Sequence, residues 1–464
     1  MQQSFLVAIK CPECGAPIRY PEGAYSFTCS YCGSVLRIQR EGVVLKYIIP
    51  ARLSVTGIRR AVKEALAGKK GSRAIARVQT VYKPFWYFKG MLYYSFVGTE
   101  GNETLAKTWY YSFQAHREYV PSFRSLSVRT EVLTLAPFDS EAAQNAGTVL
   151  SLTVDRDEAY AQASRAAEKG FQALVSTPVY RKLTLIGEHF FIIYYPIVQV
   201  DCTGDDGDRT IMIDGVNKSI LEDEPGTPAA ESQHHGDAPA FRSRLLTHRC
   251  NNCGHDLKAG DFDIVFYCDV CTRLWFLRGD EYQCLNVTVL EPAGQEGAVF
   301  MPFWRFETGI TSETTGVEMN TIGDLSTFMK MGRFLLRHQD PSRPIRIYVP
   351  ALTARDARAL MKLASQINIH QKLLPLSPRK EFPFTRMLHA SLPDDEAEEM
   401  LWVVVFAMIG RRDRKALDFY RDFTVSVTKK EMVWYPFEEK GNNFVDHFHN
   451  FHFPRKSLDL RVSG

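Results

Sequence analysis

Eight of the ten cysteines in this 464-residue chain form pairs in which two residues separate the members. The pairs come in two sets, and within each set 14 residues separate the first pair from the second. Thiolates at this spacing can meet at the corners of a tetrahedron around one soft metal ion. The candidate metal ligands are Cys11, Cys14, Cys29 and Cys32 in the first set, and Cys250, Cys253, Cys268 and Cys271 in the second.

The residues around the pairs predict a zinc ribbon at each set. Glycine follows three pairs, as Gly15, Gly33 and Gly254, and glycine accepts the positive φ of a tight metal-binding turn, whereas Thr272 follows the fourth pair. An alternating apolar run before the second pair of each set predicts a β-hairpin. Because cysteine fills all four positions, we expect two structural Zn²⁺ ions per chain, with redox dithiols or iron as the alternatives.

A basic segment is the second feature that could carry chemistry. Between Arg52 and Lys83 there are nine basic residues and one acidic residue. Such a segment can contact the phosphates of nucleic acid or of anionic lipid, although a solvated helix face is the simpler interpretation. The candidates for contact with anions or nucleic acid are Arg59, Arg60, Lys63, Lys69, Lys70 and Arg73. A weaker basic cluster further along consists of Lys330, Arg333, Arg337, Arg343 and Arg346.

Recognisable catalytic motifs are missing from the sequence. The segment Gly68–Arg73 lacks the spacing of a P-loop, and we find no nucleophile elbow, zinc-protease helix or dinucleotide fingerprint. His447 and His449 would face the same side of a strand and could begin a metal site, with a polar strand face as the default interpretation. We therefore expect a protein that is not an enzyme, with a dispersed, unrecognised active site as the alternative.

Composition fits a globular protein with more than one core. Hydrophobic residues make up 45% of the chain and charged residues 23%, and the net charge is only +3, so any basic surface must be local. The N-terminus does not resemble a signal peptide. The apolar runs His189–Val200 and Leu401–Gly410 are too short to span a bilayer. We expect a cytoplasmic protein, with any link to the inner membrane made through a partner.

Repeated motifs predict that the chain contains an internal duplication. Each cysteine set is followed by a Pro-Phe-Trp strand (Pro84–Trp86 and Pro302–Trp304) and later by a Tyr-Pro strand at Tyr195 or Tyr435. We expect the aromatic residues to pack a sheet face, with a peptide- or base-stacking surface as the alternative.

These motifs lead to an α+β fold class. Two zinc ribbons are each followed by a mostly antiparallel sheet domain with a few helices. The expected domains are ribbon 1 (1–40), α+β domain 1 (41–221), a flexible linker (222–243), ribbon 2 (244–280) and α+β domain 2 (281–464).

Apolar periodicity and capping residues predict the main helices. In two of them a capping box marks the start, formed by Asp155 with Glu158 and by Thr353 with Asp356. The predicted helical segments are Ser54–Gly68, Asp155–Gly170, Thr353–Ile367 and Pro393–Met400.

The order of these features resembles a group of bacterial proteins described as TFIIB-type zinc-ribbon proteins, some of which are called primosomal-helicase-like on the ribbon alone. The resemblance implies an association with membrane-maintenance proteins, including band-7-like and phage-shock-like scaffolds, and often a transmembrane anchor, which we do not find in this sequence. The matching segments are Cys11–Cys32, Ile49–Leu66, Val81–Phe88 and Tyr194–Leu221, and more loosely Cys250–Cys271 and Met301–Phe306.

Closed metal sites, duplicated modules and the missing catalytic motifs point to a binding function. We expect a zinc-stabilised scaffold or adaptor that binds protein partners in a bacterial cytoplasmic or membrane-associated assembly. The alternative is a nucleic-acid-binding protein that uses the ribbons and the segment Arg52–Lys83.

Overall fold

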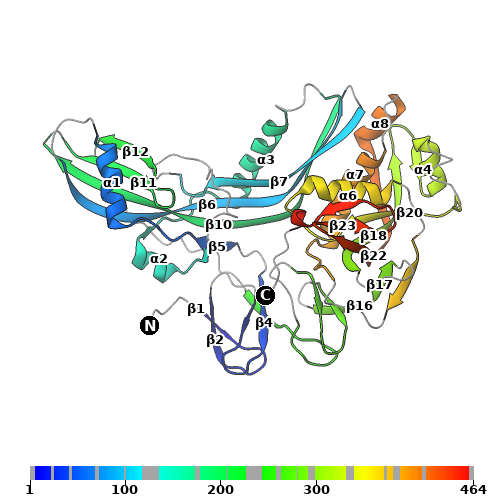
Figure 1. Ribbon diagram of the computed structural model, residues 1–464, viewed down its shortest axis with the longest axis horizontal. Helices are drawn as coiled ribbons and strands as arrows, with labels where there is room; N and C mark the ends of the chain where they lie inside the picture. Colours follow the sequence, from blue (N-terminus) through cyan, green and yellow to red (C-terminus); the bar gives the residue numbers. More distant parts are fainter. Residues whose placement is uncertain are drawn as a thin grey trace. The chain divides into compact units, whose positions relative to one another are not determined.

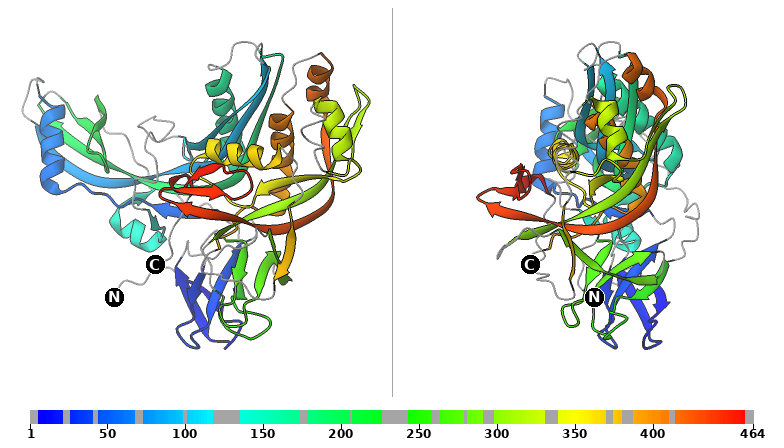
Figure 2. Two further views of the ribbon diagram at one scale, coloured as in Figure 1. Left: turned by 45° about the vertical axis from the view of Figure 1, so that its right-hand side comes forward. Right: turned by 90° about the vertical axis from the view of Figure 1, so that its right-hand side faces the viewer.

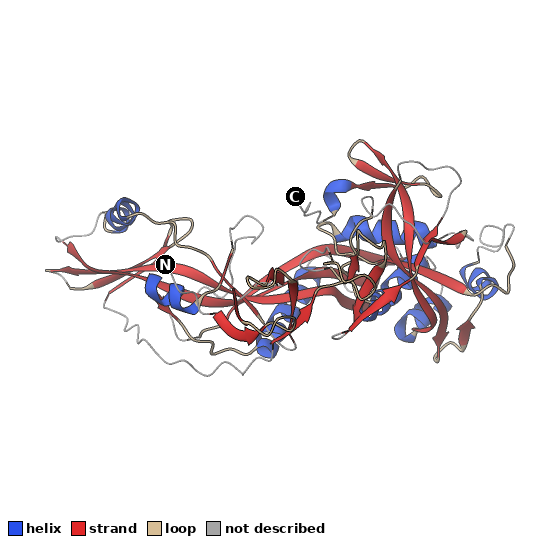
Figure 3. Ribbon diagram, turned by 90° about the horizontal axis from the view of Figure 1, so that it is seen from below, coloured by secondary structure: helices blue, strands red, loops and turns tan. Residues whose placement is uncertain are grey.

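The fold is α+β, as predicted, with mostly antiparallel strands and seven α-helices in the described part of the chain. Figure 3 shows that strands form most of the secondary structure, with shorter helices packed against them. The structure is a computed structural model, which describes residues 6–21, 26–40, 44–67, 73–98, 101–117, 135–172, 178–205, 207–225, 243–257, 263–278, 281–290, 298–330, 339–369, 374–379, 387–409 and 414–458.

The chain packs as two compact units, each built from more than one part of the sequence. Unit 1 consists of Met1–Phe88, Tyr110–Ala167 and His189–Thr247. Unit 2 consists of Lys89–Trp109, Glu168–Glu188 and His248–Gly464. The domain boundaries given above remain predictions, because this division follows packing rather than chain order. Most of the predicted linker (222–243) lies outside the described residues.

In unit 1 the first cysteine set lies among short antiparallel strands. The pairs are β1 with β2 and β3 with β4, and β13 pairs with the other edge of β4. β13 comes from the far side of the predicted linker, and its Leu245 packs against the ribbon core. The sequence analysis did not predict this strand. The bounds are β1 (Leu6–Lys10), β2 (Pro17–Pro21), β3 (Ser26–Thr28), β4 (Val35–Arg40) and β13 (Ser243–Thr247).

The first large sheet has the strand order β12-β11-β10-β5-β8, with β6 paired to β10 and both β7 and β9 paired to β6. Helices α2 (Ser140–Ala146) and α3 (Arg156–Gln172) precede β10 in the chain. The strand bounds are β5 (Leu45–Ile48), β6 (Arg73–Gly98), β7 (Gly101–Gln114), β8 (Ala136–Pro137), β9 (Thr148–Val149), β10 (Tyr180–Gly204), β11 (Arg209–Asp214) and β12 (Ile220–Pro225).

Helix α1 (Val55–Ala65) covers the end of this sheet formed by β11 and β12 (Figure 1). Its Ala61 and Val62 are buried against apolar residues of β10 and β11. Ser54 caps the helix by accepting a hydrogen bond from the N–H of Gly57. The amphipathic helix predicted at this place is therefore confirmed.

Unit 2 is built on a second sheet, of order β19-β18-β22-β17-β21, with β20 paired to β18, β23 to β22 and β24 to β23. Figure 2 shows β18 and β22 as long, curved neighbours. The strands are β17 (Val287–Leu290), β18 (Val299–Ser312), β19 (Val317–Met319), β20 (Ile345–Pro350), β21 (Leu376–Arg379), β22 (Thr424–Lys440), β23 (Asn443–Asp446) and β24 (His452–Pro454). The helices are α4 (Ile322–Met329), α6 (Ala357–Asn368), α7 (Asp394–Met408) and α8 (Arg414–Asp422).

Helix α6 begins three residues later than its predicted capping box requires. Its N-cap is Asp356, whose carboxylate accepts from the N–H groups of Arg358 and Ala359. The hydroxyl of Thr353 lies instead 3.4 Å from that of Ser391. The prediction of Thr353 as the cap was wrong because a residue distant in sequence engages its side chain.

The core of unit 2 includes residues from the first half of the chain. Met91 of β6, Ala106 of β7 and Ile186 of β10 belong to the same buried cluster as the helices α6 and α7. Lys182 stacks over the ring of Trp402, with 4.1 Å between Nζ and the ring centroid. The ends of the three long strands are therefore structural parts of unit 2.

One arrangement of hydrogen bonds, which we call the strand–helix clasp, first occurs around the first Pro-Phe-Trp motif. The N–H of Ala115 donates to the carbonyl of Pro84, and the carbonyl of Ala115 accepts from the N–H groups of Thr153 and Val154. The indole N–H of Trp86 donates to the carbonyl of Val154 over 2.8 Å. The clasp thus ties β6 to the segment that begins α3.

The strand–helix clasp occurs again around the second motif. The N–H of Ala351 donates to Pro302, and the carbonyl of Ala351 accepts from Ser391 and Leu392. The indole N–H of Trp304 donates to the carbonyl of Leu392 over 2.9 Å. In both clasps the carbonyl that the tryptophan binds lies two residues before a helix, α3 or α7.

We predict that Trp304→Phe lowers the free energy of unfolding of unit 2 by about 1–3 kcal/mol, since it leaves a buried carbonyl without its donor. Trp86→Phe should lower the stability of unit 1 by a similar amount. Urea unfolding of both variants would measure the change. Midpoints equal to that of the unmodified protein would show that the clasp does not stabilise the fold.

Candidate metal centres

The structure brings together all eight predicted cysteines, in two groups of four. In each group the four sulfur atoms lie within 4.8 Å of one another. In the first group, the sulfurs of Cys11 and Cys32 are 3.8 Å apart and those of Cys14 and Cys29 are 3.9 Å apart. A tetrahedral ion with metal–sulfur bonds of about 2.3 Å has sulfur–sulfur edges of about 3.8 Å.

The second group is slightly tighter. The sulfurs of Cys250 and Cys271 are 3.4 Å apart, as are those of Cys253 and Cys268. None of the eight cysteines forms a disulfide. Both groups are therefore compatible with one structural metal ion each. Within the described residues, these are the two places where three or more metal-ligating side chains gather closely enough to hold an ion.

The same backbone turn follows each cysteine pair. The residue after the pair donates its N–H to the carbonyl of the first cysteine over 2.9 Å in all four turns. This residue has positive φ in every case: 70° at Gly15, 74° at Gly33, 76° at Gly254 and 58° at Thr272. Thr272 adopts the same turn despite its β-branched side chain, so the fourth turn carries backbone strain that the glycines avoid.

Neighbouring groups shift the pKa values of the ligand cysteines in both directions: those of Cys32 and Cys250 are lowered toward the thiolate form, and those of Cys14, Cys253 and Cys268 are raised. The hydroxyl of Ser34 lies 3.2 Å from the Cys32 sulfur, and its hydrogen bond lowers the pKa of Cys32 to about 6. In the second group, the indole N–H of Trp275 donates to the Cys250 sulfur over 3.2 Å.

The hairpin of the second ribbon uses both of its faces. It consists of β14 (Val265–Tyr267) and β15 (Leu274–Arg278), with β16 (Glu281–Leu285) at its edge. Phe266 and Trp275 pack around the cysteines. Val265, Leu274 and Phe276 alternate with them and belong to the large core of unit 2. One face of this hairpin is therefore buried in the core of unit 2.

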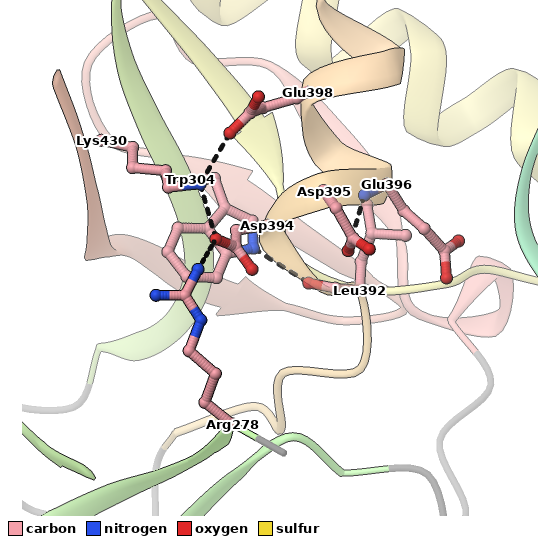
Figure 4. A network of polar contacts seen from close by, with 8 residues as sticks. All are labelled: Arg278, Trp304, Leu392, Asp394, Asp395, Glu396, Glu398 and Lys430. Carbon is pink, nitrogen blue, oxygen red and sulfur yellow. Dashed lines mark hydrogen bonds and ion pairs between the residues drawn. The ribbon is translucent and has the colours of Figure 1, made fainter. Parts of the chain in front are cut away.

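Ion pairs strengthen this attachment (Figure 4). Arg278 of β15 contacts Asp394, the first residue of α7, over 3.2 Å. Lys430 of β22 contacts the same carboxylate and that of Glu398, each over 2.7 Å. Burial tends to raise the pKa of Asp394, but Lys430 and Arg278 outweigh it and lower the pKa. The carboxylate thus joins the ribbon, the sheet and the start of α7.

A second polar attachment lies at the start of β14. Nδ1 of His389 is 2.7 Å from the carboxylate of Asp263, and the N–H of Ile264 donates to the carbonyl of Ala390 over 2.9 Å. The hydrogen bond to Asp263 raises the pKa of His389 above its ordinary value of 6.5.

The predicted basic segment is described in part. Arg59, Arg60 and Lys63 are exposed on α1, away from the buried Ala61 and Val62. Arg73 is the first residue of β6. Lys69 and Lys70 lie outside the described residues, as do Arg333 and Arg337 of the weaker basic cluster.

The two C-terminal histidines do not share a strand face, so that prediction was wrong. β23 ends at Asp446, whose carboxylate accepts from the N–H groups of Phe448 and His449 and so starts a turn. His447 is exposed, whereas the His449 ring is buried with Nδ1 2.9 Å from the carboxylate of Asp446 and 3.2 Å from the hydroxyl of Tyr435.

Comparison of the chain with protein-family models, with curated proteins and with solved structures found no match. In the described part of the chain, no helix is both long enough and apolar enough to cross a bilayer.

We predict two bound metal ions per chain and the loss of one in Cys268→Ser, because a closed site cannot lose a ligand without loosening its ion. The variant should also become protease-sensitive near the second ribbon. Cys284→Ser is the matched control, since Cys284 is exposed on β16 outside the group. Elemental analysis and limited proteolysis would measure both effects. Two ions in Cys268→Ser would contradict a structural site.

We predict that the contact between His389 and Asp263 stabilises unit 2 most at low pH. The folded-state pKa of His389 is raised, so its contribution is complete below about pH 6.5 and is lost as the pH rises through the folded pKa. The free energy of unfolding of His389→Gln should therefore be lower than that of the unmodified protein. The difference should be at most about 1 kcal/mol below about pH 6.5 and smaller at about pH 8.5.

Urea unfolding across this pH range would measure that difference. Asp263→Asn should show the same trend, because it removes the other partner. A difference that grows with pH would contradict the assignment.

Proposed function

We propose that this protein is a non-catalytic, zinc-stabilised adaptor made of two copies of one ribbon-plus-sheet unit. The observation that carries the proposal is the pair of closed four-cysteine groups, each followed in the chain by a strand–helix clasp. Zinc is the ion we propose, because four thiolates at tetrahedral separations suit Zn²⁺ and leave no open position for a reacting water.

Strand register supports the duplication. β5 runs parallel to β10 with Ile48 opposite Tyr194, and β17 runs parallel to β22 with Val289 opposite Trp434. In each case the opposed residue directly precedes the Tyr-Pro motif. β8 and β21 then pair antiparallel with the other edge of β5 and β17. The two sheets thus share their pairing around the motif.

A turn at the end of the strand that follows each Tyr-Pro strand, β11 or β23, supports the same conclusion. Ile197 pairs with Asp214, and Phe437 pairs with Asp446, two residues after the tyrosine in both halves. The carboxylate of Asp214 accepts from the second and third following N–H groups, as that of Asp446 does. Both turns close with a residue of positive φ, Lys218 at 70° and Asn450 at 56°.

Exposed apolar residues at equivalent positions of the ribbons support partner binding. Tyr31 stands between Cys29 and Cys32 and is 67% exposed, and Val270 stands between Cys268 and Cys271 and is 54% exposed. Metal sites that only stabilise a fold do not require apolar residues at these positions. We propose that the two turns contact protein partners, in the bacterial cytoplasm or at the membrane through a partner, as the resemblance to TFIIB-type zinc-ribbon proteins also implies.

A nucleic-acid-binding protein is the second candidate. The observation that favours it is the group of exposed cations Arg59, Arg60 and Lys63 on one helix. Contacts to phosphates would make the affinity fall steeply as salt concentration rises.

A pull-down of the tagged protein, with and without nuclease, tests both functions. We predict that protein partners remain after nuclease treatment and are lost from Tyr31→Ala combined with Val270→Ala, because exposed aromatic and aliphatic side chains anchor interfaces. Replacement of Arg59, Arg60 and Lys63 by Gln is the matched control and should retain them. Partners lost on nuclease treatment, or lost from the Gln variant alone, would favour nucleic-acid binding instead.

A further inference from the structure

One face of the sheet in unit 2 carries a polar cluster that the adaptor function does not use. Register places Arg305 of β18 opposite Tyr348 of β20 and opposite Glu431 of β22. Two residues further along β18, Glu307 lies opposite Arg346. Alternate residues of a strand point to the same face, and directly opposed residues share it. These five side chains therefore gather on one face.

Arg305 is the buried member of this cluster. Its side chain is only 4% exposed, and its Nη2 forms an ion pair with Glu431. Its Nε and Nη1 are buried and find no hydrogen-bond acceptor of normal geometry among the described residues. Unused donors on a buried charged group are costly. The guanidinium thus presents two N–H groups that suit an acceptor from outside this part of the chain.

Two further arginines lie near this place, Arg346 on β20 and Arg343 two residues before that strand. Nε and Nη2 of Arg346 each lie 3.1 Å from one oxygen of Glu307. Burial, and then the charge of Arg346, lower the pKa of Arg343. Burial raises the pKa of Tyr348, whereas the charge of Arg305, its contact with the phenol, and the charges of Arg346 and Arg343 oppose that rise. Three guanidinium groups thus act on one phenol, and the carboxylates of Glu307 and Glu431 offset two of the three charges. An anion would offset the positive charge that remains.

In the first half, the positions of Arg305 and Glu431 are uncharged, although Lys89 corresponds to Glu307. Counted from the Pro-Phe-Trp and Tyr-Pro motifs, Tyr87 corresponds to Arg305 and Phe191 to Glu431. The rings of Tyr87 and Phe191 lie 4.9 Å apart. Aromatic packing thus fills this position without charge, and a buried ion pair seldom adds stability over such packing. The charges in the second half point to binding rather than to stability.

We propose that Arg305, Arg343 and Arg346 bind a small phosphate-type oxyanion on this face of the sheet. A guanidinium group offers parallel N–H donors that match two oxygens of such an anion. The anion accepts from Nε and Nη1 of Arg305, and the Tyr348 hydroxyl donates to it. Glu307, Arg346 and Glu431 are each partly exposed, so the cluster reaches solvent. The site does not depend on the adaptor function.

Calorimetric titration of the metal-loaded, full-length protein with inorganic phosphate tests this site, with sodium chloride of equal ionic strength as the reference. We expect saturable binding and a melting temperature that rises with phosphate beyond the chloride reference. Arg343→Gln should weaken phosphate binding at least about tenfold. Arg358→Gln is the control for the change in charge, because it removes an exposed arginine from α6 and should bind as the unmodified protein does.

A second variant replaces Arg305 and Glu431 by the residue types found at the corresponding positions of the first half. It combines Arg305→Tyr with Glu431→Phe. It should keep both metal ions and lose phosphate binding. If this variant does not fold, Arg343→Gln still decides the question. The proposal is overturned if phosphate raises the melting temperature no more than chloride does. It is also overturned if Arg343→Gln binds phosphate with the affinity of the unmodified protein.

Vesicles identify the source of the phosphate group. A lipid headgroup is supported as the ligand if the protein sediments with phosphatidylinositol-phosphate vesicles but not with phosphatidylcholine vesicles. Arg343→Gln should then abolish this sedimentation. Phosphate binding without sedimentation supports a soluble phosphate compound. Sedimentation that Arg343→Gln leaves unchanged counts against the site.

Discussion

The gathering of four cysteine sulfurs is the constraint on which each ribbon depends. Thiolates at 3.4–3.9 Å repel one another, and segments this short cannot bury enough apolar surface to overcome that repulsion. A bound cation converts the repulsion into attraction, so the surrounding strands can form. In the second ribbon the same hairpin inserts Val265, Leu274 and Phe276 into the core of unit 2. Metal binding there is consequently coupled to the packing of a much larger structure.

The strand–helix clasps explain why the Pro-Phe-Trp motifs contain tryptophan. Phe85 and Phe303 are fully buried and need only an apolar environment. Trp86 and Trp304 are also buried, but their indole N–H groups reach the carbonyls of Val154 and Leu392. Each tryptophan therefore fixes where the chain leaves the sheet and begins a helix. In unit 2, that helix start is also the place where Asp394 receives Arg278 of the ribbon and Lys430 of the sheet (Figure 4).

Features whose partners are close in sequence could be predicted, whereas those with distant partners could not. The cysteine groups, the α+β class and helix α1 follow from local spacing and periodicity. β13 could not be predicted, because its partner β4 lies some 200 residues earlier in the chain. The packing of Lys89–Trp109 in unit 2 has the same cause. The turn at His447 arises from Asp446, whose hydrogen bonds to following N–H groups end the strand that alternation alone would extend.

If the two halves arose by the proposed duplication, the contacts that they share are those that shape the sheets. These are the clasps and the aspartate turns, which act through backbone groups. The halves differ on the surface of the sheet, where Tyr87 and Phe191 correspond to Arg305 and Glu431, and in the turn, where Asn217 corresponds to His449. Both differences add ionisable groups to the second half. Asp446 and Tyr435 hold His449 in the turn, so this histidine is part of the structure. The shared contacts form each sheet without Arg305 and Glu431, and this is why we assign that pair to the proposed binding site rather than to stability.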